Sequence, residues 1–171
     1  MAGLPDILTP GLDVVFCGTA VGTRSSERGH YYAGRGNRFY ALLFESGFTP
    51  RLLTPDEDRE LPTFGLGLTD LVKNFAQSHD RGLDFSGTPE LEVRLAPLAP
   101  RWVAFTSKKA GGEAAKAFAA ELSGYGEQNW SIAGARVFVL PSPSGASNRA
   151  PFDGRPTKIS WWSELAELAG R

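Results

Sequence analysis

The chain has 171 residues, of which 42% are hydrophobic and 22% are charged, and its formal net charge is −1. This composition is typical of a soluble protein with one sizeable core, so we expect a single domain over residues 1–171. It excludes a membrane-spanning helix, because no apolar run approaches the roughly 20 residues that a span needs. It also excludes a protein that coats nucleic acid by bulk positive charge. The single cysteine, Cys17, excludes an internal disulfide and indicates a reducing, cytoplasmic compartment.

The first predicted strand covers residues 13–18 and contains the run Val-Val-Phe-Cys-Gly. Four consecutive buriable residues are too few for a helix and typical of an inner strand of a parallel sheet. The strand enters a turn with two glycines, Gly18 and Gly22, at the carboxyl edge where open α/β folds bind ligands. No phosphate-binding glycine pattern is present. The turn therefore indicates a binding loop for something small, planar or anionic, although an ordinary strand-to-loop turn fits it equally well.

After this strand, the pattern predicts alternating loops and helices. Asn37 is a helix cap, and Thr54 followed by Pro55 starts a second, acidic helix. The elements up to the middle of the chain are then a long loop at 19–36, a helix at 38–46, a short helix from 55, an apolar stretch at 65–72 and a polar loop at 73–87.

The second half of the chain alternates strands with helices. Its predicted elements are a helix at 88–98, a strand at 102–106, a helix at 108–122, a turn region at 123–135 with room for a short strand, a strand at 137–140, a loop at 141–156 and a helix at 157–169. This alternation predicts an α/β fold with a mostly parallel sheet that is covered by helices on both faces.

Three loops that follow predicted strands would share one edge of such a sheet, namely residues 18–36, 107–109 and 141–156. A combined positive face at that edge would suit phosphate binding, but on charge alone solvated loops are the simpler interpretation. Residues 145–149 are small and flexible and end in a cation, as a loop that enters a DNA groove would be, although this pattern by itself is common in surface loops. The basic residues of the three loops are Arg24, Arg28, Arg35, Lys108, Lys109, Arg149 and Arg155.

Asp70 is the carboxylate with the strongest signal for chemistry. Its neighbours Leu68, Leu71 and Val72 are apolar, so we expect it to be partly desolvated. Desolvated carboxylates are enriched at active centres. An aspartate at this place is also a good cap for a helix over residues 71–75, and the pattern alone favours that interpretation.

Other polar side chains give weaker signals. Asp80 and Asp84 lie in the polar loop, where we expect them to be solvated. His30 and His79 have no cysteine, histidine or glutamate partner at ligand spacing, so we expect no metal site.

Four motifs occur in an order that resembles a known family. They are the Val-Val-Phe-Cys-Gly strand with its glycine turn, Gly-Asn-Arg-Phe-Tyr at 36–40, Gly-Leu-Thr-Asp-Leu-Val at 67–72, and Leu-Pro-Ser-Pro-Ser-Gly-Ala-Ser at 140–147. This combination is similar to the mismatch-specific uracil-DNA glycosylases, the bacterial relatives of thymine-DNA glycosylase. The resemblance implies a three-layer α/β/α fold that removes uracil, and often other damaged pyrimidines, opposite guanine. It implies no metal and no cofactor, and a target nucleotide that is flipped into a pocket.

The resemblance also implies roles for residues of this chain. Backbone N–H groups around Thr19 and Ala20 would stabilise the departing base anion, and Tyr32 would stack on the base. The base pocket would be formed by Gly18, Ala20, Tyr32 and Ser142. A wedge loop at 145–149 would fill the gap in the duplex, and the DNA-binding residues are Gly145, Ala146, Ser147, Arg149 and, from the positive face, Lys108.

Two departures from the family motif bear on the chemistry. The family has Gly-Ile-Asn-Pro-Gly where residues 18–22 read Gly-Thr-Ala-Val-Gly, so Ala20 stands where an asparagine positions the attacking water. Alanine offers no side-chain hydrogen bond, and Ser142 likewise replaces an asparagine. Either the protein is catalytically weak or another group holds the water. Asp70 is the best replacement, as a base for water or a stabiliser of the sugar cation, and Thr19 is the second choice.

We therefore expect a monofunctional DNA glycosylase of base excision repair that acts on uracil and other damaged or mismatched pyrimidines, with G·U mismatches preferred. Its partner would be DNA, and we expect a cytoplasmic monomer that acts at the nucleoid. Two alternatives stay open. One is a non-catalytic protein that binds mismatches or lesions, and the other is a hydrolase of free nucleosides, whose binding would depend little on salt.

Overall fold

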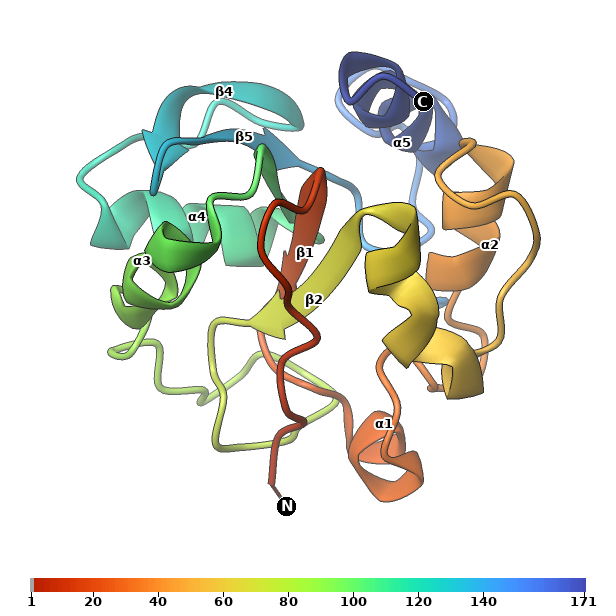
Figure 1. The fold of residues 1–171 in the computed structure, drawn as a ribbon, viewed down its shortest axis with the longest axis horizontal. Helices are drawn as coiled ribbons and strands as arrows, with labels where there is room; N and C mark the ends of the chain where they lie inside the picture. Colours follow the sequence, from red (N-terminus) through yellow and green to blue (C-terminus); the bar gives the residue numbers. More distant parts are fainter. Residues whose placement is uncertain (1) are drawn as a thin grey trace.

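The computed structural model describes residues 2–171, and its central feature is a five-stranded sheet (Figure 1). The strands are β1 (Val14–Gly18), β2 (Leu66–Asp70), β3 (Trp102–Phe105), β4 (Gly126–Ile132) and β5 (Ala135–Val139). They lie in the order β2-β1-β3-β5-β4, and β4 runs antiparallel to β5 while the other neighbours are parallel. The predicted α/β class with a mostly parallel sheet is therefore confirmed.

β1 lies between β2 and β3, and all five of its residues are buried. Because successive side chains of a strand point to opposite faces, Val14 and Phe16 enter one hydrophobic core while Val15 and Cys17 enter the other. A strand that is covered on both faces must be apolar throughout, which explains the continuous apolar run in the sequence. The register places Gly18 beside Asp70, so the two strands end at the same level.

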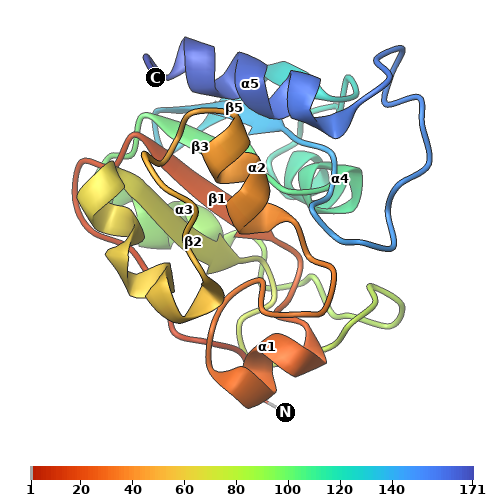
Figure 2. The same cartoon turned by 90° about the vertical axis from the view of Figure 1, so that its right-hand side faces the viewer.

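Helices cover both faces of the sheet and complete the three layers. They are α1 (Thr23–Arg28), α2 (Phe39–Glu45), η1 (Pro55–Phe64), α3 (Glu90–Leu95), η2 (Ala96–Leu98), α4 (Lys108–Ala117) and α5 (Lys158–Leu168), where η marks a 3-10 helix. α3 and α4 lie on one face of the sheet, and α2 and α5 lie on the other (Figure 1). α1 lies apart from these layers, next to the loops that leave one edge of the sheet (Figure 2).

An aromatic cluster joins the sheet to the layer that contains α2 and α5. Phe16 of β1 meets Phe39 edge-on at 5.4 Å between ring centroids and stacks on Trp162 at 5.7 Å. Phe39 in turn stacks on Tyr32 at 4.0 Å with an interplanar angle of 15°. Because aromatic pairs add to the free energy of burial, this cluster links the core rigidly to the loop that follows β1.

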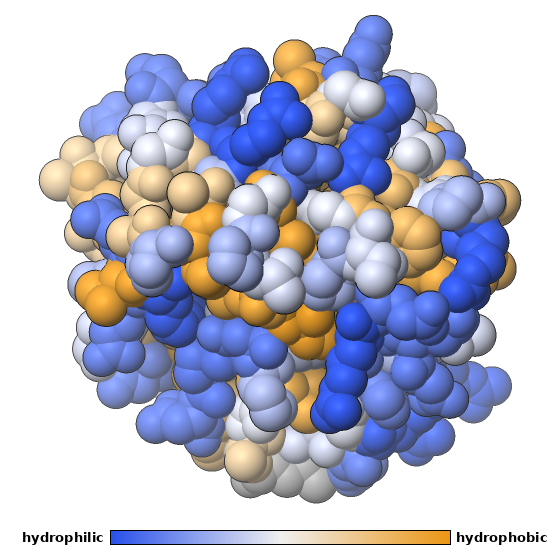
Figure 3. All heavy atoms as spheres, viewed as in Figure 1, coloured by the Kyte–Doolittle hydropathy of each residue, from blue (hydrophilic) through white to orange (hydrophobic). Residues whose placement is uncertain are grey.

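Hydrophilic residues cover most of the face shown in Figure 3, and apolar residues form a broken band across its middle. None of the helices within residues 2–171 is both long and apolar enough to span a membrane.

The structure corrects the predicted loop at 19–36, because α1 lies inside it. This helix has six residues, begins after Gly22 and ends at Gly29, which adopts a left-handed conformation with φ of 75°. Its buried residue is Ser25, so it carries no apolar periodicity by which the sequence could have revealed it.

The strand for which the sequence left room within residues 123–135 is present as β4, and with seven residues it is longer than expected. Its inward positions include Gly126 and Gln128 rather than a clear apolar alternation. The helix predicted to reach residue 122 ends at Ala117, and the chain turns at Ala119, which has a φ of 54°. The helix predicted at 88–98 begins at Glu90, and its last turn, η2, is 3-10 and contains Pro97.

The interpretation of Asp70 as a helix cap was also wrong. Asp70 is the last residue of β2, and residues 71–75 are not helical. The predicted cap at Thr54 is confirmed by a capping box with Glu57 at the start of η1.

Replacement of Phe16 by alanine should lower the free energy of unfolding by about 3–5 kcal/mol, because it opens a cavity in a fully buried aromatic cluster. Phe44 is the matched control, since its side chain is 44% exposed, and Phe44→Ala should cost about 0.5 kcal/mol or less. Urea denaturation followed by tryptophan fluorescence measures both values. Equal losses in the two variants would contradict the role given to the cluster.

Candidate active site

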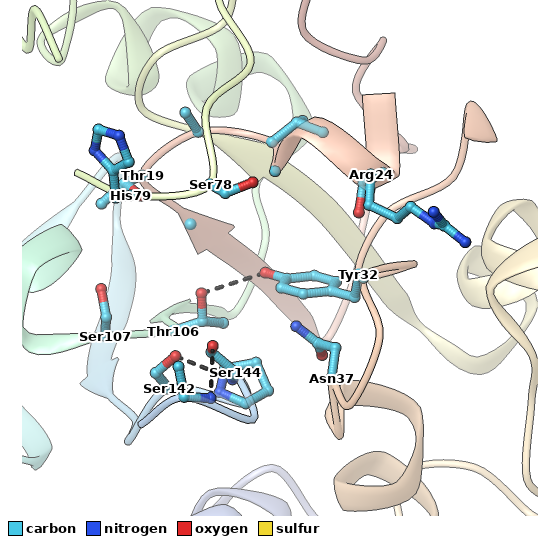
Figure 4. A pocket seen from close by; sticks show the side chains of 18 of the residues that line it. Thr19, Arg24, Tyr32, Asn37, Ser78, His79, Thr106, Ser107, Ser142 and Ser144 are labelled. Carbon is cyan, nitrogen blue, oxygen red and sulfur yellow. Dashed lines mark hydrogen bonds between the residues drawn. The ribbon is translucent and has the colours of Figure 1, made fainter. Parts of the chain in front are cut away.

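A cavity of about 620 Å³ opens at the edge of the sheet where the parallel strands end. Segments that follow β1, β2, β3 and β5 all contribute to its lining, so the predicted convergence of loops at one edge is correct (Figure 2). The residues singled out from the sequence that line it are Gly18, Thr19, Ala20, Tyr32, Asp70, Ser142, Gly145, Ala146 and Ser147. Figure 4 shows Thr19 and His79 on one side of the cavity, with Tyr32 across from them and Ser142 and Ser144 below.

Two of the predicted DNA-binding residues lie outside this lining. The Lys108 ammonium forms an ion pair with Asp153 at 2.5 Å and lies over the ring of Tyr125 at 4.4 Å. Arg149 is exposed, and it follows the residues of its loop that line the cavity. The positive face is thus smaller than predicted, because Lys109 and Arg155 are also engaged, in ion pairs with glutamates.

Asp70 lies in the floor of the cavity, and the residue is only 3% exposed. Its Oδ1 lies so near Gly18 that a Cβ on that glycine would come within 2.8 Å, which is why a glycine must end β1. Its Oδ2 is buried and has no hydrogen-bond partner among residues 2–171. Burial raises the pKa of Asp70 from 3.8 to about 7, while Lys73 lowers it, Asp6 raises it and Arg94 lowers it.

A network of charges beneath the floor sets this environment. Asp6, from the segment before β1, pairs with Lys73 at 2.6 Å and with Arg94 at 3.3 Å. Thr69 donates to the same carboxylate at 2.7 Å, and Arg94 donates to the backbone carbonyl of Asp70 at 2.8 Å. The network therefore holds the end of β2 in place while leaving the Asp70 carboxylate without a direct ion pair among the described residues.

Tyr32 forms one wall of the cavity. Its φ of 54° lies in the left-handed region, which is costly for a tyrosine and persists only where the surroundings enforce it. The ring stacks on Phe39, and its hydroxyl lies 3.2 Å from Thr106 Oγ1 (Figure 4). Tyr31 also borders the cavity, but it is buried and its hydroxyl donates to the Pro5 carbonyl at 3.0 Å.

The opposite rim is the loop that follows β5, and it is tied to the loop before α2. Arg38 N–H donates to the Pro143 carbonyl at 2.8 Å, and a Cβ on Gly145 would lie 2.8 Å from the Gly36 carbonyl oxygen. Lys158 donates to the Ser142 carbonyl at 2.5 Å. These contacts hold the loop in one position against its neighbour.

The third rim is the segment 77–80, which the sequence did not mark as part of the site. Asp80 was expected to be solvated, but it accepts a hydrogen bond from the Thr19 hydroxyl at 2.6 Å, and both residues line the cavity. No local pattern could have indicated this contact, because it joins residues that are far apart in the sequence.

Arg24 and Arg35 supply positive charge at the mouth of the cavity. Both are exposed, and neither forms an ion pair with another of residues 2–171. They also line an adjoining groove of about 470 Å³, together with apolar residues such as Leu52 and Pro55. The mouth is therefore suited to an anionic chain that continues past the cavity.

Comparison with known proteins agrees with this architecture. A family model described as the uracil DNA glycosylase superfamily matches residues 5–166. The chain is also similar to the solution NMR structure of a candidate uracil DNA glycosylase from Methanosarcina acetivorans. The two share 21% sequence identity with a TM-score of 0.61, and the match covers 99% of this chain and 98% of the other. At that identity, the likeness shows a shared fold.

The raised pKa of Asp70 predicts a pH dependence of stability. Between the unfolded pKa of 3.8 and the folded pKa of about 7, the folded protein binds more protons than the unfolded chain, so stability falls as pH rises through this window. Asp70→Asn removes the titration. Relative to this variant, the wild type should lose roughly 3 kcal/mol of unfolding free energy between about pH 5 and about pH 8. Urea titrations at both pH values test this, and parallel pH dependences would contradict it.

Proposed function

The chain belongs to the uracil DNA glycosylase superfamily, and on that premise we propose that it is a monofunctional DNA glycosylase of the mismatch-specific kind. It would hydrolyse the N-glycosidic bond of uracil flipped out of duplex DNA, with G·U mismatches preferred and other damaged pyrimidines accepted. The observation that carries the proposal is that one cavity is lined by the buried carboxylate of Asp70, by the ring of Tyr32 and by the glycine turn that follows β1. The family acts on DNA, and this chain would act on it as a monomer.

The cavity suits a flipped pyrimidine nucleotide. One face of the Tyr32 ring stacks on Phe39, which does not line the cavity. The other face of the Tyr32 ring would be available for a base to stack on. The ring is held by its stack on Phe39 and by its hydroxyl contact to Thr106, so little conformational entropy would be lost on binding.

The end of β1 would stabilise the base as it leaves as an anion. Neither the Thr19 nor the Ala20 N–H donates to another backbone group among residues 2–171. Unpaired backbone donors that are fixed at the edge of a cavity are well suited to a developing negative charge. Gly18 would allow the base to approach, and Ser142 would complete the pocket on the opposite rim.

Asp70 would be the catalytic carboxylate. Its carboxylate lies in the floor of the cavity, and its buried Oδ2 has no partner among residues 2–171, so Asp70 would stabilise a sugar cation by its charge or act as a base for water. This role would compensate for Ala20, which cannot hold a water with its side chain. Thr19, whose hydroxyl lines the cavity, would assist.

The rims would hold the DNA. Gly145, Ala146 and Ser147 would enter the gap left by the flipped nucleotide, with Arg149 on the flanking backbone. Arg24 and Arg35 are better placed for phosphate contacts than Lys108, which would have to leave Asp153.

A non-catalytic protein that binds mismatches is the second candidate. Ala20 favours this candidate, because it stands where the family that this sequence resembles has an asparagine that positions the attacking water. Such a protein would use the same rims and cavity without cleaving the glycosidic bond.

Asp70→Asn should lower the single-turnover rate of uracil excision from a G·U duplex by about 100-fold or more at about pH 8. The wild-type rate should rise as pH passes through about 7, because the carboxylate then ionises, and the variant should lack this rise. Undiminished excision would contradict the role of Asp70. No excision by the wild type, with retained salt-sensitive binding to the mismatch, would favour the non-catalytic protein.

Arg35→Ala should weaken binding to a G·U duplex and reduce the slope of log affinity against log salt by about 1, since one phosphate contact is lost. Arg59→Ala is the matched control, because Arg59 is an exposed arginine outside the cavity. Fluorescence anisotropy over a salt series measures both slopes, and an equal change in the two variants would rule out a specific role for Arg35.

A further inference from the structure

The contact between Thr19 and Asp80 places a second carboxylate in the cavity. Thr19 follows β1 in the chain, Asp80 comes from the loop after β2, and their oxygens are 2.6 Å apart. Asp70 lies in the floor and is almost fully buried, whereas Asp80 is partly exposed. The cavity therefore contains one carboxylate closed off from solvent and another that solvent can reach.

Backbone contacts hold the segment of Asp80 alongside the turn that follows β1. Val21 forms a bridge with Ala76, and Gln77 N–H donates to the Val21 carbonyl at 2.8 Å. Thr23 N–H donates to the Ser78 hydroxyl at 3.1 Å. Asp80 thus follows residues that are hydrogen-bonded to the turn after β1.

Side-chain contacts then shape the segment itself. The Gln77 amide nitrogen lies 2.6 Å from the carbonyl oxygens of both His79 and Arg81, which flank Asp80. The amide donates to carbonyls on both sides of the aspartate and so restrains its backbone. A restrained backbone keeps the carboxylate at one distance from Thr19, as a positioned catalytic group requires.

The two side chains together can hold a water. The Thr19 hydroxyl donates its proton to Asp80, so its lone pairs remain available to accept a hydrogen bond. The second carboxylate oxygen of Asp80 can accept another. A water between them would be held by two acceptors next to Ala20, where the side chain itself offers none.

We propose that Asp80, oriented by Thr19, holds the attacking water and takes its proton. The inference rests on the proposed glycosylase function and deepens it. The water oxygen forms a bond to C1′ of the deoxyribose as the C1′–N1 bond breaks. The electron pair of that bond leaves with the base, and the water proton passes to the Asp80 carboxylate. While the C1′–N1 bond breaks, Asp70 at the floor stabilises the positive charge that develops on the sugar, by its own charge alone.

Single-turnover excision from a G·U duplex tests this division of roles in Asp80→Asn and Thr19→Val. Asp80→Asn should be slower than the wild type by about 100-fold, the usual contribution of a general base. Thr19→Val should be slower by about tenfold, since it removes one hydrogen bond to a charged group. Asp84→Asn is the matched control, because Asp84 belongs to the same loop and does not line the cavity, and it should match the wild type.

Binding and rescue separate chemistry from structure. Asp80→Asn should bind a duplex with the non-cleavable 2′-fluoro-deoxyuridine opposite guanine as tightly as the wild type does. Formate should restore part of the excision rate in Asp80→Ala, because it can occupy the vacated space and accept the proton.

The other possible results distinguish a failure of the role given to Asp80 from a failure of the proposed glycosylase function. Full activity of Asp80→Asn in the presence of an active wild type would overturn the role of Asp80 and leave the proposed function intact. Slow excision with equally weakened binding and no rescue by formate would make Asp80 a structural residue. An inactive wild type would overturn the proposed function, and this inference with it.

Discussion

The burial of the Asp70 carboxylate is the constraint on which the rest of the cavity depends. A carboxylate in the interior disfavours its charged form unless neighbouring groups compensate. Here Lys73 and Arg94 lie close enough to lower its pKa, but both are bound to Asp6, so neither neutralises Asp70 directly. Gly18 is required beside it, because any side chain there would collide with the carboxylate.

The aromatic cluster supports Tyr32, which forms one wall of the same cavity. Trp162, Phe16 and Phe39 connect α5, β1 and α2, and Tyr32 stacks on the last of these rings. A tyrosine with a positive φ keeps that backbone only if packing enforces it. The core of the protein thus fixes the orientation of a cavity residue, and binding of a planar base would require little rearrangement.

Two carboxylates at different depths suit two different tasks. The buried one interacts strongly with a nearby charge because the surroundings are poorly screened. The partly exposed one can exchange protons with solvent after each turnover. In the proposed function, this division would replace the single asparagine that the motif at residues 18–22 lacks.

Local sequence determined the elements whose signals are themselves local. The apolar run of β1, the Thr54 cap and the alternation of strands with helices predicted the α/β fold, and the apolar neighbours of Asp70 marked it as desolvated. Periodicity failed for α1 and was weak for β4, because the buried residue of α1 is Ser25 and the buried residues of β4 include Gly126 and Gln128. Only the tertiary structure decided that Asp70 ends a strand, that Lys108 is engaged by Asp153, and that Asp80 meets Thr19. These depend on contacts between segments distant in the chain, whose free energy comes from packing rather than from the conformational preferences of neighbouring residues.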